Sequence, residues 1–569
     1  MLKRQYLIPI FILLLAAVFR LALLDIKPPH FDEGINGWFC DQMAKNGYYA
    51  YDPNNYHGPL HFYVLFFSLT SFGRNLWALR LPVVFVGLFS IFWVFLYRPF
   101  FGRTICYLAA LAMALSPGFI FYNRYSIHES WLVLFLLVTC WGLLGIWTSR
   151  EPKYFWGSIL GLAGMILTKE TYIIHLFSLF CAGVGIALLN RFFPSSPELS
   201  RGKGRLPMNH IIGATAVGLV LIIFFYSGNL RHWQGLADLF RTFLPWTKTG
   251  IDAAGHGKAD FDFVPLLPPF LAHAPVLASF ASFKLNWYWM RLFLDYEWVA
   301  MLGLAFSFRF LFGGNPGLRF LAIYSLVALF IYSIVPYKTP WCVISITWPF
   351  LFLGAAFLKL IATQALSFLR FRPLRIPSPS SPASSAGNGG VDPPAEGNRV
   401  ISTLVALVLF ILVALPFGQA AWKSFDLNFV HFDDPKERYV YVQTFRDYHS
   451  LIDPILAKLA RDPQAKADLK GTVLLSSYFP IPWVLGDVAD IGYYGAEQGK
   501  WPKDLDADFI VLDEEKADKF EKHLKDSYFI EDFTLRDGME GSRVYFKYDT
   551  FRDIFPGRQA DFDPGQSEE

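Results

Sequence analysis

The sequence has few charged residues and few cysteines. Only 17% of its 569 residues are Asp, Glu, Lys or Arg, whereas 54% are hydrophobic. A soluble chain of this length would form several domains with charged surfaces, so this balance indicates a polytopic membrane protein. The five cysteines have no metal-type spacing and none follows Cys342, which argues against a zinc cluster and a disulfide framework.

Common nucleotide-binding and hydrolase motifs are also absent. The sequence contains no phosphate-binding Gly-rich loop and no serine-hydrolase elbow. We expect no nucleic acid among its partners. The net charge of +3 is small, so the positions of Lys and Arg are more informative than their sum.

Apolar runs that could cross a hydrocarbon core of roughly 30 Å recur along the chain. They lie at about 6–24, 80–97, 104–121, 131–148, 155–168, 171–190, 211–227, 298–313, 318–335, 342–362 and 400–420. Lys and Arg mark alternate connections, which the positive-inside rule places in the cytoplasm. We therefore expect about 11 transmembrane helices in the plasma membrane, with the N-terminus cytoplasmic as a retained signal anchor.

Composition divides the chain into four parts. We expect a transmembrane module with outer-loop interfacial helices over 1–362, a disordered cytoplasmic linker over 363–399, the last transmembrane helix over 400–422, and an extracytoplasmic α/β domain over 423–569. Within that domain the sequence predicts strands at 472–476, 509–512 and 543–548, helices at about 435–461 and 514–526, and loops at 480–483 and 491–495. The apolar segment Leu60–Phe72 is too short to span, so we expect an interfacial helix on the outer surface.

Asp32 and Glu33 follow the first apolar run and therefore lie just outside the membrane. On a helix, adjacent side chains diverge by roughly 100°, so the pair suits two different roles better than one shared proton. The structural alternative is a helix N-terminus, where acidic residues offset the macrodipole.

The other outer connections carry ionisable residues at the rim of the apolar runs. Charges at such depth are costly and are usually paired or functional. They include His57, His61, Arg124, His128, Glu129, Lys169, Glu170, Lys284, Arg291, Asp295, Glu297 and Lys338. Their gathering on one side of the membrane favours a functional surface.

Each of these groups also has a structural interpretation. Arg124 and His128 would share a helix face and could reach the interface together. Lys169 and Glu170 could form an ion pair of little consequence. Lys284, Tyr288, Arg291 and Asp295 recur at the spacing of one helix face, which is typical of the solvated side of an interfacial helix.

The order of these features resembles that of the polytopic lipid-donor glycosyltransferases of the GT-C fold, which include the protein O-mannosyltransferases and the aminoarabinose transferases of lipid A. The resemblance covers about residues 1–340 and rests on the acidic pair, Gly58-Pro59-Leu60, Leu81-Pro82 and Leu167-Thr168-Lys169. A prokaryotic family named for association with flippase activity looks closer still. That likeness lies in the segments 337–341, 439–444, 480–483 and 493–495.

The resemblance implies sugar transfer, with inversion, from a polyprenyl-phosphate-linked donor to an acceptor hydroxyl at the outer membrane face. The acceptor would be a glycan, lipid or protein. Asp32 would be the general base and Glu33 would position acceptor or donor. The expected substrate-binding residues are Lys338, Arg124 and Lys169 at the lipid phosphate, with Glu129, His57, Lys284 and Tyr337 around them.

Two questions stay open at this point. No cofactor is required by the sequence, although His57, His128 and Glu129 are candidates for a divalent metal ion without a metal-type spacing. The alternative function is a non-catalytic partner in translocation or assembly of lipid-linked oligosaccharide. A solute transporter would show inverted repeats and midplane charges, and we find neither in the sequence.

Overall fold

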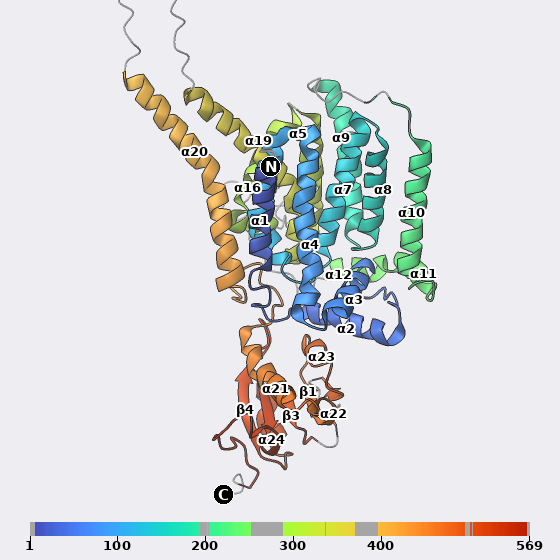
Figure 1. Ribbon diagram of the computed structural model, residues 1–569, viewed down its shortest axis with the longest axis vertical. Coiled ribbons are helices and arrows are strands. Elements are labelled where there is room, and N and C mark those ends of the chain that lie inside the picture. Colours follow the sequence, from blue (N-terminus) through green and yellow to red (C-terminus); the bar gives the residue numbers. More distant parts are fainter. Residues whose placement is uncertain are drawn as a thin grey trace, which may run out of the picture.

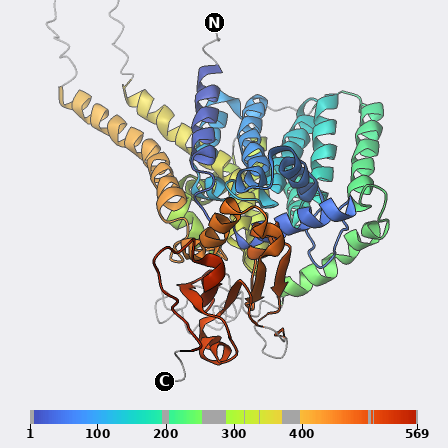
Figure 2. The same cartoon turned by 60° about the horizontal axis from the view of Figure 1, so that its bottom comes forward.

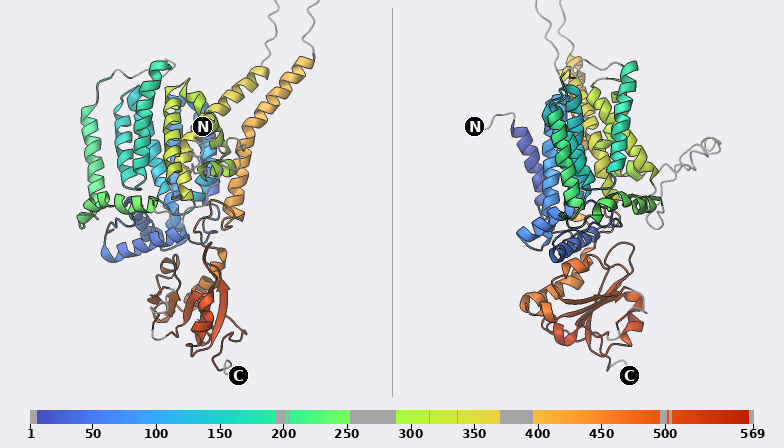
Figure 3. Two further views of the ribbon diagram at one scale, coloured as in Figure 1. Left: turned by 180° about the vertical axis from the view of Figure 1, so that it is seen from behind. Right: turned by 90° about the vertical axis from the view of Figure 1, so that its right-hand side faces the viewer.

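The computed structural model describes residues 6–193, 202, 204–251, 288–313, 315–335, 337–369, 396–495, 501–502 and 505–565. A bundle of long helices forms one part of the molecule, and a smaller domain with a sheet lies at one end of it (Figure 1). Two further views show the same separation of the two parts (Figure 3). This arrangement confirms the architecture predicted from the sequence, a helical membrane module with a C-terminal α/β domain.

The helical part is listed here in chain order. It comprises α1 (Leu7–Leu21), α2 (Phe31–Asn46), α3 (Leu60–Phe72), α4 (Leu76–Val94), α5 (Arg98–Leu115), α6 (Pro117–Tyr122), α7 (Glu129–Thr148), α8 (Pro152–Ile166), α9 (Tyr172–Phe192), α10 (Met208–Tyr226), α11 (Gln234–Arg241), α12 (Phe243–Ile251), α15 (Tyr288–Tyr296), α16 (Trp298–Ala305), α17 (Ser307–Leu311), α18 (Pro316–Ile334), α19 (Val343–Leu369) and α20 (Glu396–Phe425).

Among the described residues, 7 helical stretches are long and apolar enough to cross a membrane. The protein is therefore a multi-pass membrane protein. Helices α1 and α8, with 15 residues each, are shorter than these stretches, and the run at 298–313 is broken into α16 and α17. One stretch, Leu76–Leu115, has 40 residues and holds two of the expected runs.

That 40-residue stretch is two antiparallel helices, α4 and α5. Arg80, near the start of α4, donates to the carbonyl of Leu24, and Arg20 donates to the carbonyl of Ala114 at the end of α5. The start of α4 and the end of α5 thus meet the same end of α1. Gly102 lies where the chain turns, with a φ of 78°, a left-handed conformation that glycine adopts without strain.

Short helices cross the end of the bundle that faces the C-terminal domain. Helix α2 lies across this end, between the long helices and the C-terminal domain, and the pair α11–α12 lies across it below α10 (Figure 2). Helix α3 has the bounds expected for the segment Leu60–Phe72, and its side chains His61, Phe62 and Leu65 are buried. Among these crosswise helices, α2 contacts the C-terminal domain through α23.

The C-terminal domain is built on a five-stranded mixed sheet in the order β2-β1-β3-β5-β4. Strand β1 is parallel to β2 and β3, with Thr472 opposite Ile510, and β5 is antiparallel to β3 and β4, with Val544 opposite Val511. Val511 and Ile510 enter different hydrophobic clusters, so both faces of the sheet are buried. Its elements are β1 (Lys470–Leu474), β2 (Asp490–Tyr493), β3 (Phe509–Asp513), β4 (Tyr528–Phe533), β5 (Ser542–Lys547), α21 (His449–Arg461), α22 (Ala465–Asp468), α23 (Ile481–Val484), α24 (Ala517–Glu521) and α25 (Tyr548–Phe551).

Several local predictions for this domain need correction. The three predicted strands coincide with β1, β3 and β5, but the segment 491–495, predicted as a loop, contributes to the edge strand β2, and 480–483 contains the short helix α23. The helix predicted from residue 435 begins only at His449. Before it the chain forms turns and a bridge between Thr444 and Arg536, and the amide of Phe445 donates to the carbonyl of Leu535. We call residues 431–448 the connector.

The C-terminal domain docks on α2 through small residues. A Cβ atom at Gly37 would lie 2.3 Å from the indole of Trp483, and one at Gly34 would lie 2.5 Å from Pro480. Arg74 donates to Asp41 at 2.9 Å and to the carbonyl of Trp483. The absence of side chains at the two glycines therefore permits the contact between α2 and α23.

We predict that Gly37→Ala loosens this contact. By helix propensity alone, Ala is favoured over Gly by about 1 kcal/mol, but overpacking against Trp483 costs about 1–3 kcal/mol. Thermal unfolding in detergent and proteolysis of the connector should show a less stable, more cleavable protein. Gly418→Ala in α20 is the control, because no atom lies within 4 Å of its Cβ position. Equal behaviour of the two variants would contradict this account of the docking.

A buried carboxyl group joins the bundle to the connector. Glu297 accepts hydrogen bonds from the Ser116 hydroxyl at 2.8 Å, the Gly118 amide at 2.8 Å and the Tyr439 hydroxyl at 3.2 Å. Burial raises the pKa of Glu297 to about 7, although these hydrogen bonds oppose the rise.

This raised pKa predicts a pH-dependent stability. An unfolded Glu titrates near pH ~4.3, so between that pH and about 7 only the folded protein keeps the proton, and stability falls as pH rises through this window. The effect of roughly 3 kcal/mol should vanish in Glu297→Gln. Unfolding midpoints of the two proteins at pH 5 and pH 8 provide the measurement. The same change between these pH values in both proteins would show that Glu297 is not the titrating group.

Candidate active site

Asp32 is held in the first turn of α2 by a reciprocal cap. The Asp32 amide donates to His30 Nδ1 at 3.1 Å, and the His30 amide donates to Glu33 Oε2 at 2.9 Å. Burial lowers the pKa of His30, so its ring is neutral and its Nε2–H donates to the carbonyl of Tyr441 at 2.8 Å. The Asp32 side chain itself is 33% exposed and is left accessible.

Glu33 points the other way and is completely buried with Arg80. Its Oε1 accepts from Arg80 Nε at 2.9 Å and from the Ser126 amide at 2.8 Å, while Oε2 accepts from Arg80 Nη2 at 2.7 Å and from the His30 amide. Burial would raise the pKa of Glu33, but the Arg80 guanidinium outweighs it and the pKa is lowered. The sequence predicted that Glu33 would position a substrate. In the structure Glu33 instead anchors α2, and it does not line the cavity described below.

We predict that Glu33→Gln destabilises the protein. Glutamine keeps the shape but removes the charge, and breaking a buried ion pair typically costs about 3–5 kcal/mol because the partner charge is left uncompensated. The unfolding midpoint in detergent should drop clearly, whereas Asp32→Asn, at an accessible position on the same helix turn, should leave it nearly unchanged. Equal midpoints for both variants would refute the anchoring role.

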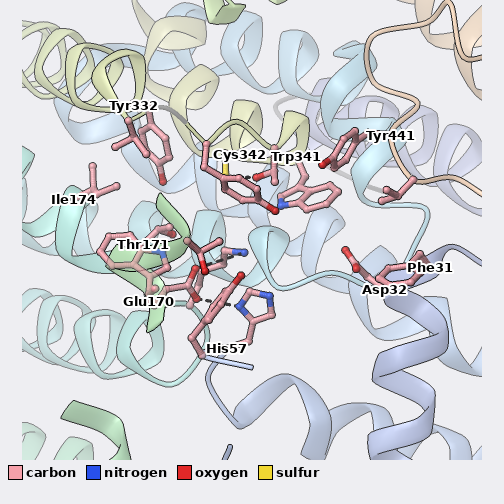
Figure 4. Close-up of a pocket in the computed structure, with 18 of the residues that line it drawn as sticks. Phe31, Asp32, His57, Glu170, Thr171, Ile174, Tyr332, Trp341, Cys342 and Tyr441 are labelled. Carbon is pink, nitrogen blue, oxygen red and sulfur yellow. Dashed lines mark hydrogen bonds and ion pairs between the residues drawn. The ribbon is translucent and has the colours of Figure 1, made fainter. Parts of the chain in front are cut away.

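Asp32 lines a cavity of about 700 Å³ between the bundle and the C-terminal domain (Figure 4). The lining combines charged groups with many aromatic and aliphatic side chains. It consists of Phe31, Asp32, Tyr56, His57, Lys169, Glu170, Thr171, Ile174, Trp246, Thr247, Thr249, Trp289, Tyr332, Ile334, Val335, Tyr337, Thr339, Trp341, Cys342, Tyr441, Val442, Ser477, Arg536 and Met539. A space of this size and character fits an amphiphilic molecule.

Across the cavity from Asp32 lie His57 and Glu170 (Figure 4). Backbone pairing brings these segments together: the Gly58 amide donates to the carbonyl of Thr168, and the Leu60 amide donates to the carbonyl of Leu167, both at 3.0 Å. A Cβ atom at Gly58 would lie 2.3 Å from the Leu167 oxygen. The two segments noted in the sequence as Gly-Pro-Leu and Leu-Thr-Lys therefore meet.

This pairing places an ionic cluster on the cavity wall. Lys169 Nζ lies 2.5 Å from Glu129 Oε1, and His57 Nδ1 lies 3.0 Å from Glu170 Oε2. Burial would lower the pKa of Lys169, but Glu129 and Glu170 outweigh it and hold the pKa well above its usual value. Burial would likewise raise the pKa of Glu170, but Lys169 and His57 lower it. Lys169 and Glu170 are thus a charged pair.

The structure divides the predicted site residues into three groups. Asp32, His57, Lys169 and Tyr337 line the cavity, and Glu129 holds Lys169 from outside it. Glu33, Arg124 and Lys338 do not line it. Lys284 lies outside the described residues.

Arg124 and Lys338 donate hydrogen bonds to backbone carbonyls at the ends of helices. Arg124 donates to the carbonyls of Phe19, Ala22 and Leu23 beyond α1. Lys338 is fully buried and donates to the carbonyls of Tyr332, Ser333 and Val335 at the end of α18. The last carbonyls of a helix have no partner within it, so both cations satisfy the backbone at positions where the sequence favoured a lipid phosphate.

His57 and His128, two of the candidate metal ligands, pack together with His61. His61 accepts from Trp131 Nε1 at 3.1 Å through Nδ1 and contacts the Ser126 hydroxyl at 3.0 Å through Nε2. The His128 ring packs 4.4 Å from the His61 ring and 4.5 Å from the His57 ring, and Glu129 faces Lys169. These side chains do not converge on one point, so they do not fit a metal ion.

Among the described residues, one group of side chains does have ligand atoms close enough for an ion: Asp426, His431 and Glu437, near the connector. These groups already have partners. Lys423 Nζ lies 3.4 Å from Asp426 and 3.7 Å from Glu437, and the Tyr296 hydroxyl donates to Glu437 at 2.5 Å. We assign this cluster to holding the connector.

Sequence reasoning missed the contribution of the C-terminal domain. Ser477, Arg536 and Met539 line the cavity, and the Arg536 guanidinium lies 4.5 Å from the Phe31 ring beside Asp32. The segment 439–444 had been noted for its family likeness, and Tyr441 and Val442 from it line the cavity. No pattern in the sequence pointed to Arg536.

The helical bundle, the juxtamembrane carboxylate and the covering domain are those of an integral membrane protein with an outer-surface cavity. A family model described as dolichyl-phosphate-mannose-protein mannosyltransferase matches residues 56–199. The structure is similar to that of ArnT from Cupriavidus metallidurans bound to undecaprenyl phosphate, with a TM-score of 0.51, 15% identity and coverage of 94% of this chain and 97% of that chain.

The apo state of the same ArnT gives a TM-score of 0.50 and 14% identity, and covers 97% of this chain and 99% of that chain. No curated protein matches the chain. At these identities the similarity shows that the chain has the GT-C fold. Membership of the flippase-associated family stays a prediction.

Proposed function

We propose that the protein is a membrane glycosyltransferase that moves a sugar from a polyprenyl-phosphate-linked donor to an acceptor hydroxyl at the outer membrane face, with inversion. The observation that carries this proposal is the accessible carboxylate of Asp32 in a cavity that combines charged and apolar walls. The family model matched by residues 56–199 describes a transferase with a lipid-phosphate-linked sugar donor. A polyprenyl phosphate occupies the related fold of ArnT.

The reaction requires a proton acceptor on one side of the sugar and a leaving phosphate on the other. Asp32 takes the proton of the acceptor hydroxyl while that oxygen attacks the anomeric carbon. The bond between the anomeric carbon and the phosphate oxygen breaks, and its electron pair stays on the phosphate. The products are a glycosylated acceptor, a polyprenyl phosphate and a proton on Asp32.

The cavity walls suit the parts of such a donor. Ile174, Trp246, Trp289 and Ile334 offer apolar surface for an isoprenoid chain. Aromatic side chains with hydroxyl groups, such as Tyr337, suit a sugar ring because they combine an apolar face with a polar tip. The acceptor would be a glycan, a lipid or a protein, and it would enter beside Asp32.

Asp32→Asn separates an enzyme from a non-catalytic partner in lipid-linked oligosaccharide translocation or assembly. Asn keeps the size of Asp but cannot take the proton, and a general base contributes typically about 10²–10⁴-fold to the rate. Transfer from a polyprenyl-phosphate sugar by the purified variant should fall by that factor, with donor binding and unfolding midpoint retained.

Asp52→Asn is the control in the same outer loop. Asp52 lies outside the cavity lining, and its side chain accepts the amide of Asn54, a role that Asn also fills. This variant should keep full transfer. An active Asp32→Asn, or a wild-type protein that transfers no sugar from any such donor, would refute the proposed reaction.

A further inference from the structure

The cavity between the bundle and the C-terminal domain has only two cationic lining residues among those described, Lys169 and Arg536. They differ in what surrounds them. Lys169 lies 2.5 Å from Glu129 and 3.9 Å from Glu170, so two carboxylates already balance its charge. An anionic phosphate at Lys169 would therefore have to compete with these carboxylates.

Arg536 has a different set of partners. Its Nη2 donates to the carbonyls of Ser477 at 3.0 Å and Phe479 at 2.9 Å and to the Ser477 hydroxyl at 3.2 Å, and its Nε contacts the Met539 sulfur. All of these are neutral acceptors, and in the described part of the chain Nη1 has no hydrogen-bond partner. The side chain is only 4% exposed. Its positive charge is thus buried, oriented and uncompensated by direct ion pairing.

The backbone around Arg536 is also fixed. Residue 536 pairs with Thr444 of the connector, and the guanidinium lies over the Phe31 ring at 4.5 Å. Burial lowers the pKa of Arg536 to about 10, with Asp32 opposing the decrease, which leaves the group cationic at neutral pH. Asp32 and Arg536 line the same cavity without forming an ion pair within 4.0 Å, so Arg536 is not neutralised by direct contact with the proposed base.

We propose that Arg536 of the C-terminal domain binds the phosphate of the lipid-linked donor, so that this domain completes the active site. The proposal rests on the proposed function. Sugar transfer converts a phosphodiester with one negative charge into a phosphate monoester with up to two, so negative charge grows at the phosphate as the bond breaks. A fixed guanidinium without a direct ion pair stabilises that growth, and its forked N–H groups match phosphate oxygens.

The test compares two lipids that differ only in the phosphate, undecaprenyl phosphate and undecaprenol, binding to the purified full chain. Trp246, Trp289 and Trp341 line the cavity, so intrinsic tryptophan fluorescence reports binding. For Arg536→Gln we expect the Kd for undecaprenyl phosphate to rise about 10- to 100-fold, the factor expected for a charged hydrogen bond. The Kd for undecaprenol should not change, and Arg536→Lys should lie between Arg536→Gln and wild type.

Arg558→Gln is the matched control. Arg558 also lies near aromatic rings of the C-terminal domain, at 5.7 Å from Phe529, and donates to the carbonyl of Ile530, but it does not line the cavity. Its variant should bind both lipids like wild type.

Each result decides between defined readings. An equal loss of both lipids in Arg536→Gln would mean displacement of the C-terminal domain rather than loss of a phosphate contact, and would overturn the inference. Unchanged binding of undecaprenyl phosphate would also overturn it while leaving the proposed function intact. Wild-type protein that binds the phosphate no better than the alcohol would overturn the proposed function as well.

Discussion

The buried pair of Glu33 and Arg80 is the interaction on which the geometry of the site depends. It ties the start of α2 to α4, and through the Ser126 amide to the segment before α7. Because successive side chains on a helix diverge by roughly 100°, fixing Glu33 inward turns Asp32 outward. The two adjacent carboxylates thus have separate roles: one holds the helix, and the other faces the cavity.

Buried cations elsewhere in the bundle have a common task. Arg20, Arg124 and Lys338 each donate to backbone carbonyls at or near the end of a helix. In the bilayer core no water is available to hydrogen-bond such carbonyls, so protein groups must do so. A cation near a helix C-terminus is further favoured by the macrodipole. This explains why the cations of the outer connections include fewer substrate-binding residues than their number suggests.

The sequence was sufficient for the features that depend on local pattern. Apolar runs predicted the helices of the bundle, and the position of Asp32 after the first run placed it just outside the membrane, where it lines the cavity. The ionisable residues His57 and Lys169, also inferred from their depth, both line the cavity because the segments that carry them pair through their backbones. These residues are near the ends of strongly apolar segments, where sequence is most informative.

The other roles depend on contacts that no local pattern encodes. Whether Lys338 faces a ligand or folds back on α18 is decided by the path of the chain after Val335. Arg536 belongs to a domain at the other end of the chain, and its place in the cavity follows from the docking of Trp483 on Gly37. In place of the helix expected from residue 435, the connector forms turns, and its contacts with residues 535 and 536 satisfy part of its backbone.

The charge distribution of the cavity links docking to chemistry. The bundle alone contributes Asp32, Glu170 and a Lys169 whose charge is balanced by Glu129, so its surface is unfavourable for an anionic phosphate. The C-terminal domain adds Arg536, and it does so through the same contact that places Phe31 under the guanidinium. Because Gly34 and Gly37 have no side chains, the domain packs closely enough on α2 for Arg536 to line the cavity. The packing of α2 against α23 therefore controls the electrostatics of the cavity as well as the stability of the domain interface.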